Sequence, residues 1–259
     1  MSKLTVFVKA SLTSSALCLC LALAVPAYAK NNHQHTPDVI RQMLSKLSLN
    51  EIQKQDIKQI YQESRQNKDV FRTDAKSFRQ KIQRLVQTNE WDQAAVESAL
   101  ASHQTVINDN ALQRALKNNQ IWNLLTETQQ AELLSQLEVR KGKRGSNKQR
   151  RVRVGKILKR LDLTDKQTAA VKAIKSAAKD NIETSKSKIK TYKQAERTLI
   201  QRTNFNPEAW QTLNAQYQSD FMTMALLKIQ TKHDVWNLFT TGQQNKAKKL
   251  VNARKNKQG

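Results

Sequence analysis

WNLLTETQQ at Trp122–Gln130 and WNLFTTGQQ at Trp236–Gln244 are almost the same phrase, placed 114 residues apart (236 − 122) in one chain. The same offset aligns the chain before each phrase without gaps, so that LSKLSLNEIQ at 44–53 falls on LKRLDLTDKQ at 158–167. A repeat of this length exceeds the roughly 20–50 residues of a solenoid repeat. The sequence therefore predicts two homologous domains rather than a repeat array.

The segments outside the repeat have different compositions. Residues 1–29 combine a basic start, an apolar run and the small residues AYA, the layout of a secretory signal peptide cleaved before Lys30. Both cysteines, Cys18 and Cys20, lie in this segment, which leaves no thiol for a disulfide after export. We expect a periplasmic protein with a first unit at 30–138, a basic linker at 139–155 and a second unit at 156–259.

Charge is distributed unevenly over the chain, whose formal net charge is +24. Residues 30–138 carry 14 basic and 13 acidic residues, whereas residues 139–259 carry 29 basic and 8 acidic residues. A field of this size steers association with anionic partners. In a periplasm these partners would be lipopolysaccharide, an anionic membrane surface or acidic stretches of unfolded protein, and no nucleic acid is expected.

The hydrophobic pattern favours an all-α fold of two tandem units, each with about four helices, including long antiparallel amphipathic helices. In the first unit we expect helices near 37–46, 51–87, 92–124 and 127–139, and the second unit repeats them. The second of these helices has an a/d seam of apolar residues: Phe71, Ala75, Phe78, Ile82 and Leu85. The second unit has Ser185 and Glu196 at seam positions, which predicts a weaker seam there.

Four capping boxes punctuate the two units. In each, an apolar residue is followed by Asn or Thr, two variable residues and Gln, so that the side chains of the polar residue and the Gln satisfy backbone N–H groups at a helix start. The four are Leu49-Asn50-x-x-Gln53, Leu125-Thr126-x-x-Gln129, Leu163-Thr164-x-x-Gln167 and Phe239-Thr240-x-x-Gln243. Each cap contributes about 1 kcal/mol. Gly242 in the first turn of the last helix predicts a poorer start there.

Two such pairs, each 76 residues apart (125 − 49 and 239 − 163), resemble the paired L-T-x-x-Q motifs of the Spy/CpxP family of periplasmic stress proteins. The resemblance covers nearly all of the chain after residue 29. It implies an ATP-independent chaperone, without cofactors, that holds unfolded or misfolded envelope proteins on a concave, basic and partly apolar helical face. Relatives are usually single units that dimerise into a curved cradle, and some damp envelope-stress signalling or bind metal.

Basic residues beside apolar ones on the long helices are the client-binding candidates: Arg65, Arg72, Lys76, Arg79 and Arg84 in the first unit, and Lys179, Lys186, Lys190 and Lys193 in the second. The duplication also leads us to expect that the two units form an intrachain pseudo-dimer.

Polyanion binding, metal binding and catalysis are the alternatives to a chaperone function. The basic second half favours a polyanion-binding protein that coats lipopolysaccharide or anionic lipid. No metal site is predicted, since His33 and His35 are the one histidine cluster and lie near a chain end; they are weak candidates only. The chain has neither a phosphate-binding glycine loop nor a nucleophile motif, so no enzyme and no catalytic residue is predicted.

Overall fold

The computed structural model describes residues 39–66, 68–142 and 157–256. The predicted signal peptide, His33, His35 and most of the predicted linker lie outside these residues. Within them every regular element is a helix, which confirms the all-α class. No helix in these ranges is long and apolar enough to cross a membrane.

The two units repeat one order of helices. The first contains α1 (Val39–Leu44), α2 (Glu51–Gln66), α3 (Lys68–Val86), α4 (Gln93–Ser102), α5 (Gln104–Leu124) and α6 (Glu127–Gly142). The second contains α8 (Asp165–Ile200), α9 (Pro207–Gln216), α10 (Gln218–Asn237) and α11 (Thr241–Asn256). α8 covers in one helix the positions that α2 and α3 cover in the first unit, and α6 continues four residues past position 138.

The predicted third helix of each unit is interrupted, at His103 and at the equivalent Tyr217. Each has φ near −100° and ψ near 0°, so each N–H bonds the carbonyl three residues back, Leu100 or Asn214, at 3.3 Å. The side chains explain the interruptions, because both point into the protein. His103 stacks on Phe78 with ring centroids 4.2 Å apart, and the Tyr217 ring meets the edge of Tyr192 at 5.7 Å.

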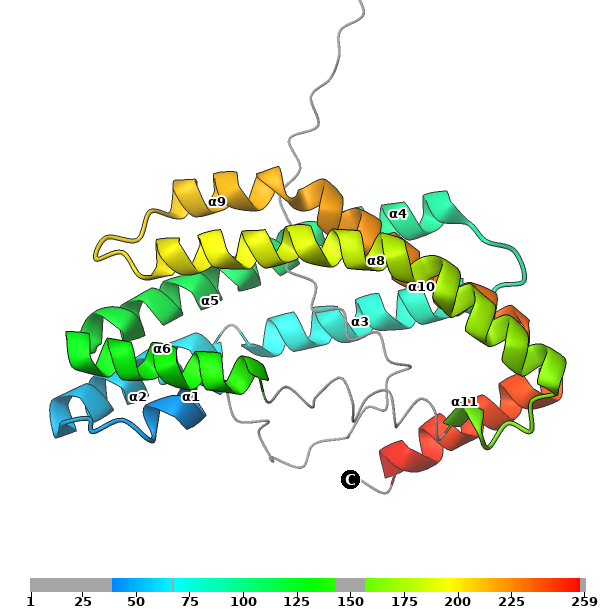
Figure 1. Cartoon of the computed structure of the whole chain (residues 1–259), viewed down its shortest axis with the longest axis horizontal. Coiled ribbons are helices and arrows are strands. Elements are labelled where there is room, and N and C mark those ends of the chain that lie inside the picture. Colours follow the sequence, from blue (N-terminus) through cyan, green and yellow to red (C-terminus); the bar gives the residue numbers. More distant parts are fainter. Residues whose placement is uncertain (1–38, 67, 143–156, 257–259) are drawn as a thin grey trace, which may run out of the picture.

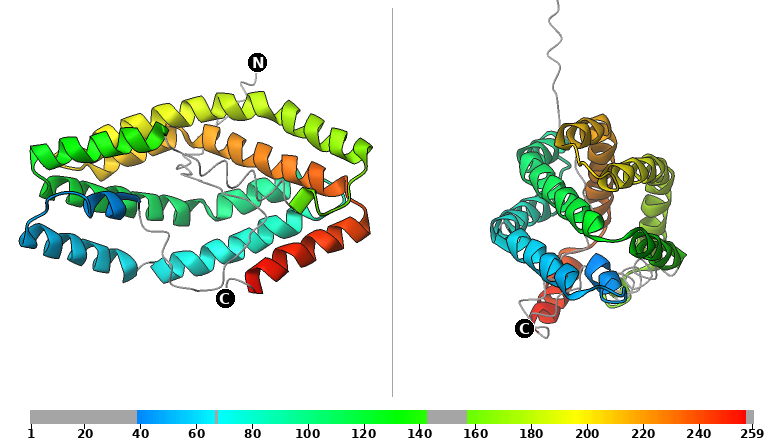
Figure 2. Two further views of the ribbon diagram at one scale, coloured as in Figure 1. Left: turned by 60° about the horizontal axis from the view of Figure 1, so that its bottom comes forward. Right: turned by 90° about the vertical axis from the view of Figure 1, so that its left-hand side faces the viewer.

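Three hydrophobic clusters draw side chains from both units. Phe78 and Ile82 of α3 pack with Leu100 of α4 and with Ala225 and Ile229 of α10. The second cluster joins Ile107 of α5 to Ile189, Tyr192, Phe221 and Met224, and the third joins Ala111 and Ala115 of α5 to Trp210 of α9. The units therefore share their core, and they lie along one elongated body with α1, α2 and α6 at one end and α11 at the other (Figures 1 and 2).

Hydrogen bonds between the units follow the 114-residue repeat. The buried side chains of Gln104 and Gln218, which are equivalent positions, meet at 3.4 Å. Asn123 donates to the Thr203 carbonyl at 2.9 Å, and its equivalent Asn237 donates to the Asn89 carbonyl at 3.3 Å. Because Asn89 is the equivalent of Thr203, the same contact is made in both directions, as in an isologous interface.

The apolar seam of α3 is buried as expected at Ala75, Phe78 and Ile82. The two polar side chains in the second seam, Ser185 and Glu196, are either buried or hydrogen-bonded. Ser185 is buried, and a Glu196 carboxylate oxygen accepts from the Tyr192 hydroxyl and the Trp210 indole N–H, each at 3.1 Å. These bonds offset the cost of placing a polar group at the edge of the core.

Trp210→Ala tests whether the shared core makes the units unfold together. Trp210 is 1% exposed, and truncation should lower the free energy of unfolding by about 3–5 kcal/mol. In urea, tryptophan fluorescence and far-UV circular dichroism should still give one coincident transition. The exposed neighbour Gln211→Ala should cost less than about 0.5 kcal/mol. Two separate transitions, with only one shifted by Trp210→Ala, would contradict the shared core.

Candidate functional site

Each motif forms the predicted capping box. At the start of α6, the Thr126 hydroxyl accepts from the Gln129 N–H at 3.3 Å, and Gln129 Oε1 accepts from the Thr126 N–H at 2.9 Å. At α2 the corresponding bonds of Asn50 and Gln53 are 2.8 and 3.1 Å, so Asn replaces Thr without losing the cap. All four helix starts therefore use the motif to satisfy orphan N–H groups.

The two motifs of a unit also bind each other. Gln53 Nε2 donates to Gln129 Oε1 at 2.8 Å, and Gln129 Nε2 donates to Gln53 Oε1 at 3.1 Å. The second amide hydrogen of each Gln reaches the backbone before the partner motif, at the Leu124 carbonyl (2.7 Å) and the Ser48 carbonyl (2.8 Å). Each primary amide thus makes two donations and accepts twice, which uses its whole hydrogen-bonding capacity.

The second unit repeats this glutamine pair. The side-chain amides of Gln167 and Gln243 donate hydrogen bonds to each other at 2.8 and 3.0 Å. They also donate to the backbone carbonyls of Leu238 and Asp162, respectively. Asp162 has φ of 51°, a left-handed conformation that Asp tolerates better than most residues. Thr240 and Gln243 complete the cap of α11 at 3.0 and 3.3 Å despite Gly242.

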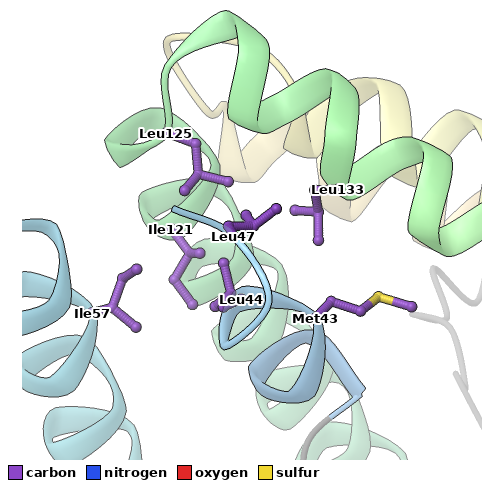
Figure 3. Packing of buried hydrophobic residues seen from close by; sticks show 7 residues of the cluster. All are labelled: Met43, Leu44, Leu47, Ile57, Ile121, Leu125 and Leu133. Carbon is purple, nitrogen blue, oxygen red and sulfur yellow. The ribbon is translucent and has the colours of Figure 1, made fainter. Parts of the chain in front are cut away.

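The remaining residues of the repeated segment stabilise the turns between α5 and α6 and between α10 and α11. Gln130 donates to the carbonyls of Trp122 and Leu125 at 3.0 and 3.1 Å, and Gln244 does the same in the second unit for Trp236 and Phe239. The apolar residue of the motif turns inward, with Leu125 and Phe239 5% and 9% exposed. Figure 3 shows Leu125 converging with Leu47 and Ile121 on the core at this end of the body.

The motifs therefore stabilise the fold, and the side-chain amides of their glutamines make hydrogen bonds within the protein. Sequence reasoning predicted the caps, but it missed the glutamine pair and the Asn123 and Asn237 contacts. The 76-residue spacing shared by both units was the available signal for the pair. The described residues contain no group of His, Cys, Asp and Glu that could hold a metal ion, and His33 and His35 lie outside them.

The client-binding candidates follow the repeat as well. Four pairs coincide under the 114-residue offset: Arg65 with Lys179, Arg72 with Lys186, Lys76 with Lys190 and Arg79 with Lys193. The described side chains of Lys76, Arg84, Lys179, Lys186, Lys190 and Lys193 are exposed, and Arg79 is half-buried. Arg65 and Arg72 lie on α2 and α3, and their side chains are outside the described set. Among the described side chains, the equivalent residues Lys76 and Lys190 are exposed in both units.

One ionisable cluster, built around a buried histidine, lies where α4 meets α5. His103 is buried and its Nδ1 lies 2.6 Å from an Asp74 carboxylate oxygen. Burial lowers the pKa of His103 below its ordinary value, the Asp74 carboxylate opposes this, and Arg79 lowers the pKa further. Burial likewise lowers the pKa of Arg79 and of Lys175. The second unit has Lys188 and Tyr217 at the equivalents of Asp74 and His103, so it lacks this titratable pair.

A double-mutant cycle tests the glutamine pair. Gln53→Ala and Gln129→Ala should each cost about 1–3 kcal/mol of unfolding free energy, because each leaves a partner amide unpaired. The double variant should cost less than the sum, with a coupling energy of about 0.5–3 kcal/mol. The matched control combines Gln53→Ala with Gln243→Ala of the other unit, which should be additive within about 0.5 kcal/mol. Additivity in the first cycle would contradict the pair.

The His103 pKa predicts a pH dependence of stability. The folded state binds the His103 proton less tightly than the unfolded chain does. The contribution of neutral His103 to the free energy of unfolding is therefore fully present above pH about 6.5. It is lost as the pH falls from there through the lowered folded pKa. His103→Gln, which cannot titrate, should flatten the fall of the urea midpoint between about pH 7 and pH 5. An equal difference between variant and parent at every pH would refute this assignment.

Comparison with protein families gives two matches to one model, that of the LTXXQ motif family, at residues 35–137 and 150–251. Comparisons with curated proteins and with solved structures give no match. The family is periplasmic and generally non-enzymatic, and its match supports a general role related to envelope stress. The match confirms the resemblance to Spy/CpxP-type proteins and the tandem duplication. Because the two matches together cover more than half of its length, this chain belongs to the LTXXQ motif family.

Proposed function

We propose that the protein is an ATP-independent holding chaperone of the periplasm, in which two family units of one chain form an intrachain pseudo-dimer. Its clients are unfolded or aggregation-prone envelope proteins. The observation that carries the proposal is the register of the basic residues, which recurs at equivalent positions on the long helices of both units. A surface repeated in this way offers an extended, irregular client several equivalent attachment points, and simultaneous attachment raises the overall affinity.

The arrangement of the units supports the pseudo-dimer. Their shared clusters bury side chains of both units together, and the exposed Asn123 and Asn237 make reciprocal hydrogen bonds between the units. The linkage within one chain makes this association independent of protein concentration, unlike that of two separate subunits. A holding protein that must act when clients are abundant gains a surface that does not dissociate on dilution.

Two exposed apolar side chains supply the non-electrostatic part of the proposed surface. Ile52 on α2 is 71% exposed and Val139 on α6 is 56% exposed, and they are the large hydrophobic residues most open to solvent in the described chain. Apolar contacts hold non-native segments through water release, which salt does not screen. The basic candidates on the long helices would attract acidic stretches of the same clients.

Light scattering of an aggregating model protein, without ATP, tests the proposal. Suppression by the periplasmically purified protein should persist between about 0.1 M and about 1 M salt, although the Debye length falls from about 10 Å to about 3 Å. Suppression that vanishes at the higher salt would show binding by charge alone and refute the proposal.

A paired substitution identifies the apolar contribution. Ile52→Ser with Val139→Ser should weaken suppression most clearly at high salt, where charge is screened. Gln55→Ser with Ala131→Ser changes exposed positions on the same two helices and should leave suppression unchanged. Circular dichroism of both variants checks that the helices are retained.

A further inference from the structure

Six lysines form a single row along α8. They are Lys172, Lys175, Lys179, Lys186, Lys190 and Lys193, and all six are exposed, although partial burial lowers the pKa of Lys175. At 3.6 residues per turn they fall within about 60° of the helix circumference and extend over about 32 Å. The row lies about a quarter turn from the buried positions Val171, Ile189 and Tyr192, so it borders the body without facing its core.

Acidic residues offset little of this row. α8 also carries Asp165, Asp180, Glu183 and Glu196. Glu196 is directed toward Tyr192 and Trp210, as described above, and Glu183 is the one acidic residue within the row between Lys172 and Lys193, where it pairs with Lys186. Lys188 lies on the opposite flank and pairs with Asp220 at 2.7 Å. The row therefore keeps a net positive charge along its length.

The described second unit combines this charge with an absence of strongly exposed large apolar side chains, since Ile52 and Val139 both belong to the first unit. Such a surface can bind a charged interface electrostatically without inserting apolar side chains into it. Lysine ammonium groups suit this contact, because they act as hydrated point charges and, unlike arginine, do not form a fixed two-pronged pairing with one group.

We propose that the lysine row of α8 docks the protein peripherally on an anionic phospholipid surface. A helix that carries six ammonium groups over about 32 Å can bring them all to one partner only if that partner extends in the same direction, as a bilayer surface does. Each lysine near an anionic membrane contributes about a fivefold gain in binding, so six give reversible attachment without an anchor. The row includes four of the proposed client-binding residues, Lys179, Lys186, Lys190 and Lys193, so a membrane and an acidic client segment would share this surface, although holding itself needs no membrane.

Docking through α8 would orient the protein. The second unit, residues 156–259, carries 21 basic and 8 acidic residues, which draws it toward the membrane, whereas the first unit is nearly neutral. The exposed Ile52 and Val139 belong to the nearly neutral unit and are not required for docking.

Co-sedimentation with vesicles tests the docking surface. The full protein purified from the periplasm should bind vesicles of phosphatidylcholine with about one-third phosphatidylglycerol, should not bind phosphatidylcholine alone, and should dissociate as salt rises. The row variant, Lys179→Gln, Lys186→Gln, Lys190→Gln and Lys193→Gln, should bind at least about tenfold more weakly. The matched control removes four exposed lysines of the first unit, Lys54, Lys58, Lys76 and Lys81, and should stay within about threefold of the parent.

Three outcomes would overturn the proposal. Equal losses in the row variant and the control would show that net charge alone drives binding. Binding to phosphatidylcholine alone would show apolar attachment. Preference for lipopolysaccharide over the phosphatidylglycerol vesicles in direct competition would assign the row to that ligand instead. Circular dichroism excludes misfolding, and light scattering without vesicles measures holding separately, so that failure of one proposal is distinguishable from failure of the other.

Discussion

The reciprocal bond between two glutamine side chains is the interaction on which each unit depends. Gln53 and Gln129 each cap their own helix and at the same time bind the backbone that precedes the other helix. Neither helix start can move without breaking the cap of the other, because one amide serves both. A pair of ordinary caps would hold each helix locally and leave their relative position to apolar packing. The glutamine pair instead fixes the end of the unit, and Leu125 and Leu47 fill the core beneath it.

Duplication within one chain allows equivalent positions to diverge while the contacts between the units remain. Gln104 and Gln218 have kept the same residue and meet each other. Nearby positions have changed: His103 corresponds to Tyr217, and Trp91 to Phe205. Trp91 packs against His233 at 5.4 Å, whereas Phe205 packs in the cluster of Trp210. In two identical subunits each change would appear twice at the interface; here it appears once, so a titratable pair such as Asp74 and the buried His103 can occur in one unit alone.

The sequence predicted the helices, the caps and the duplication because these depend on local spacing and on residues that recur at a fixed offset. It did not predict the interruptions at His103 and Tyr217, since neither residue is a helix breaker and both bend the chain through tertiary packing of their rings. The glutamine pair was missed for a related reason. A capping box explains Gln129 completely within four residues, and nothing local reveals that its amide also reaches Gln53. The basic candidates were placed by helical register, which the repeat preserves.

Charge asymmetry acquires a physical role once the units are seen to share a core. In two freely linked domains, the electrostatic field of one domain has no fixed orientation relative to the other. Units that share a core hold their fields in a fixed relative orientation. The second unit then acts as the charged side of an oriented particle and the first as the side with exposed apolar residues. Separate symmetric subunits could not divide these properties, because a two-fold axis would place each on both halves. Tandem fusion therefore lets one paired scaffold carry different surface properties on its two units.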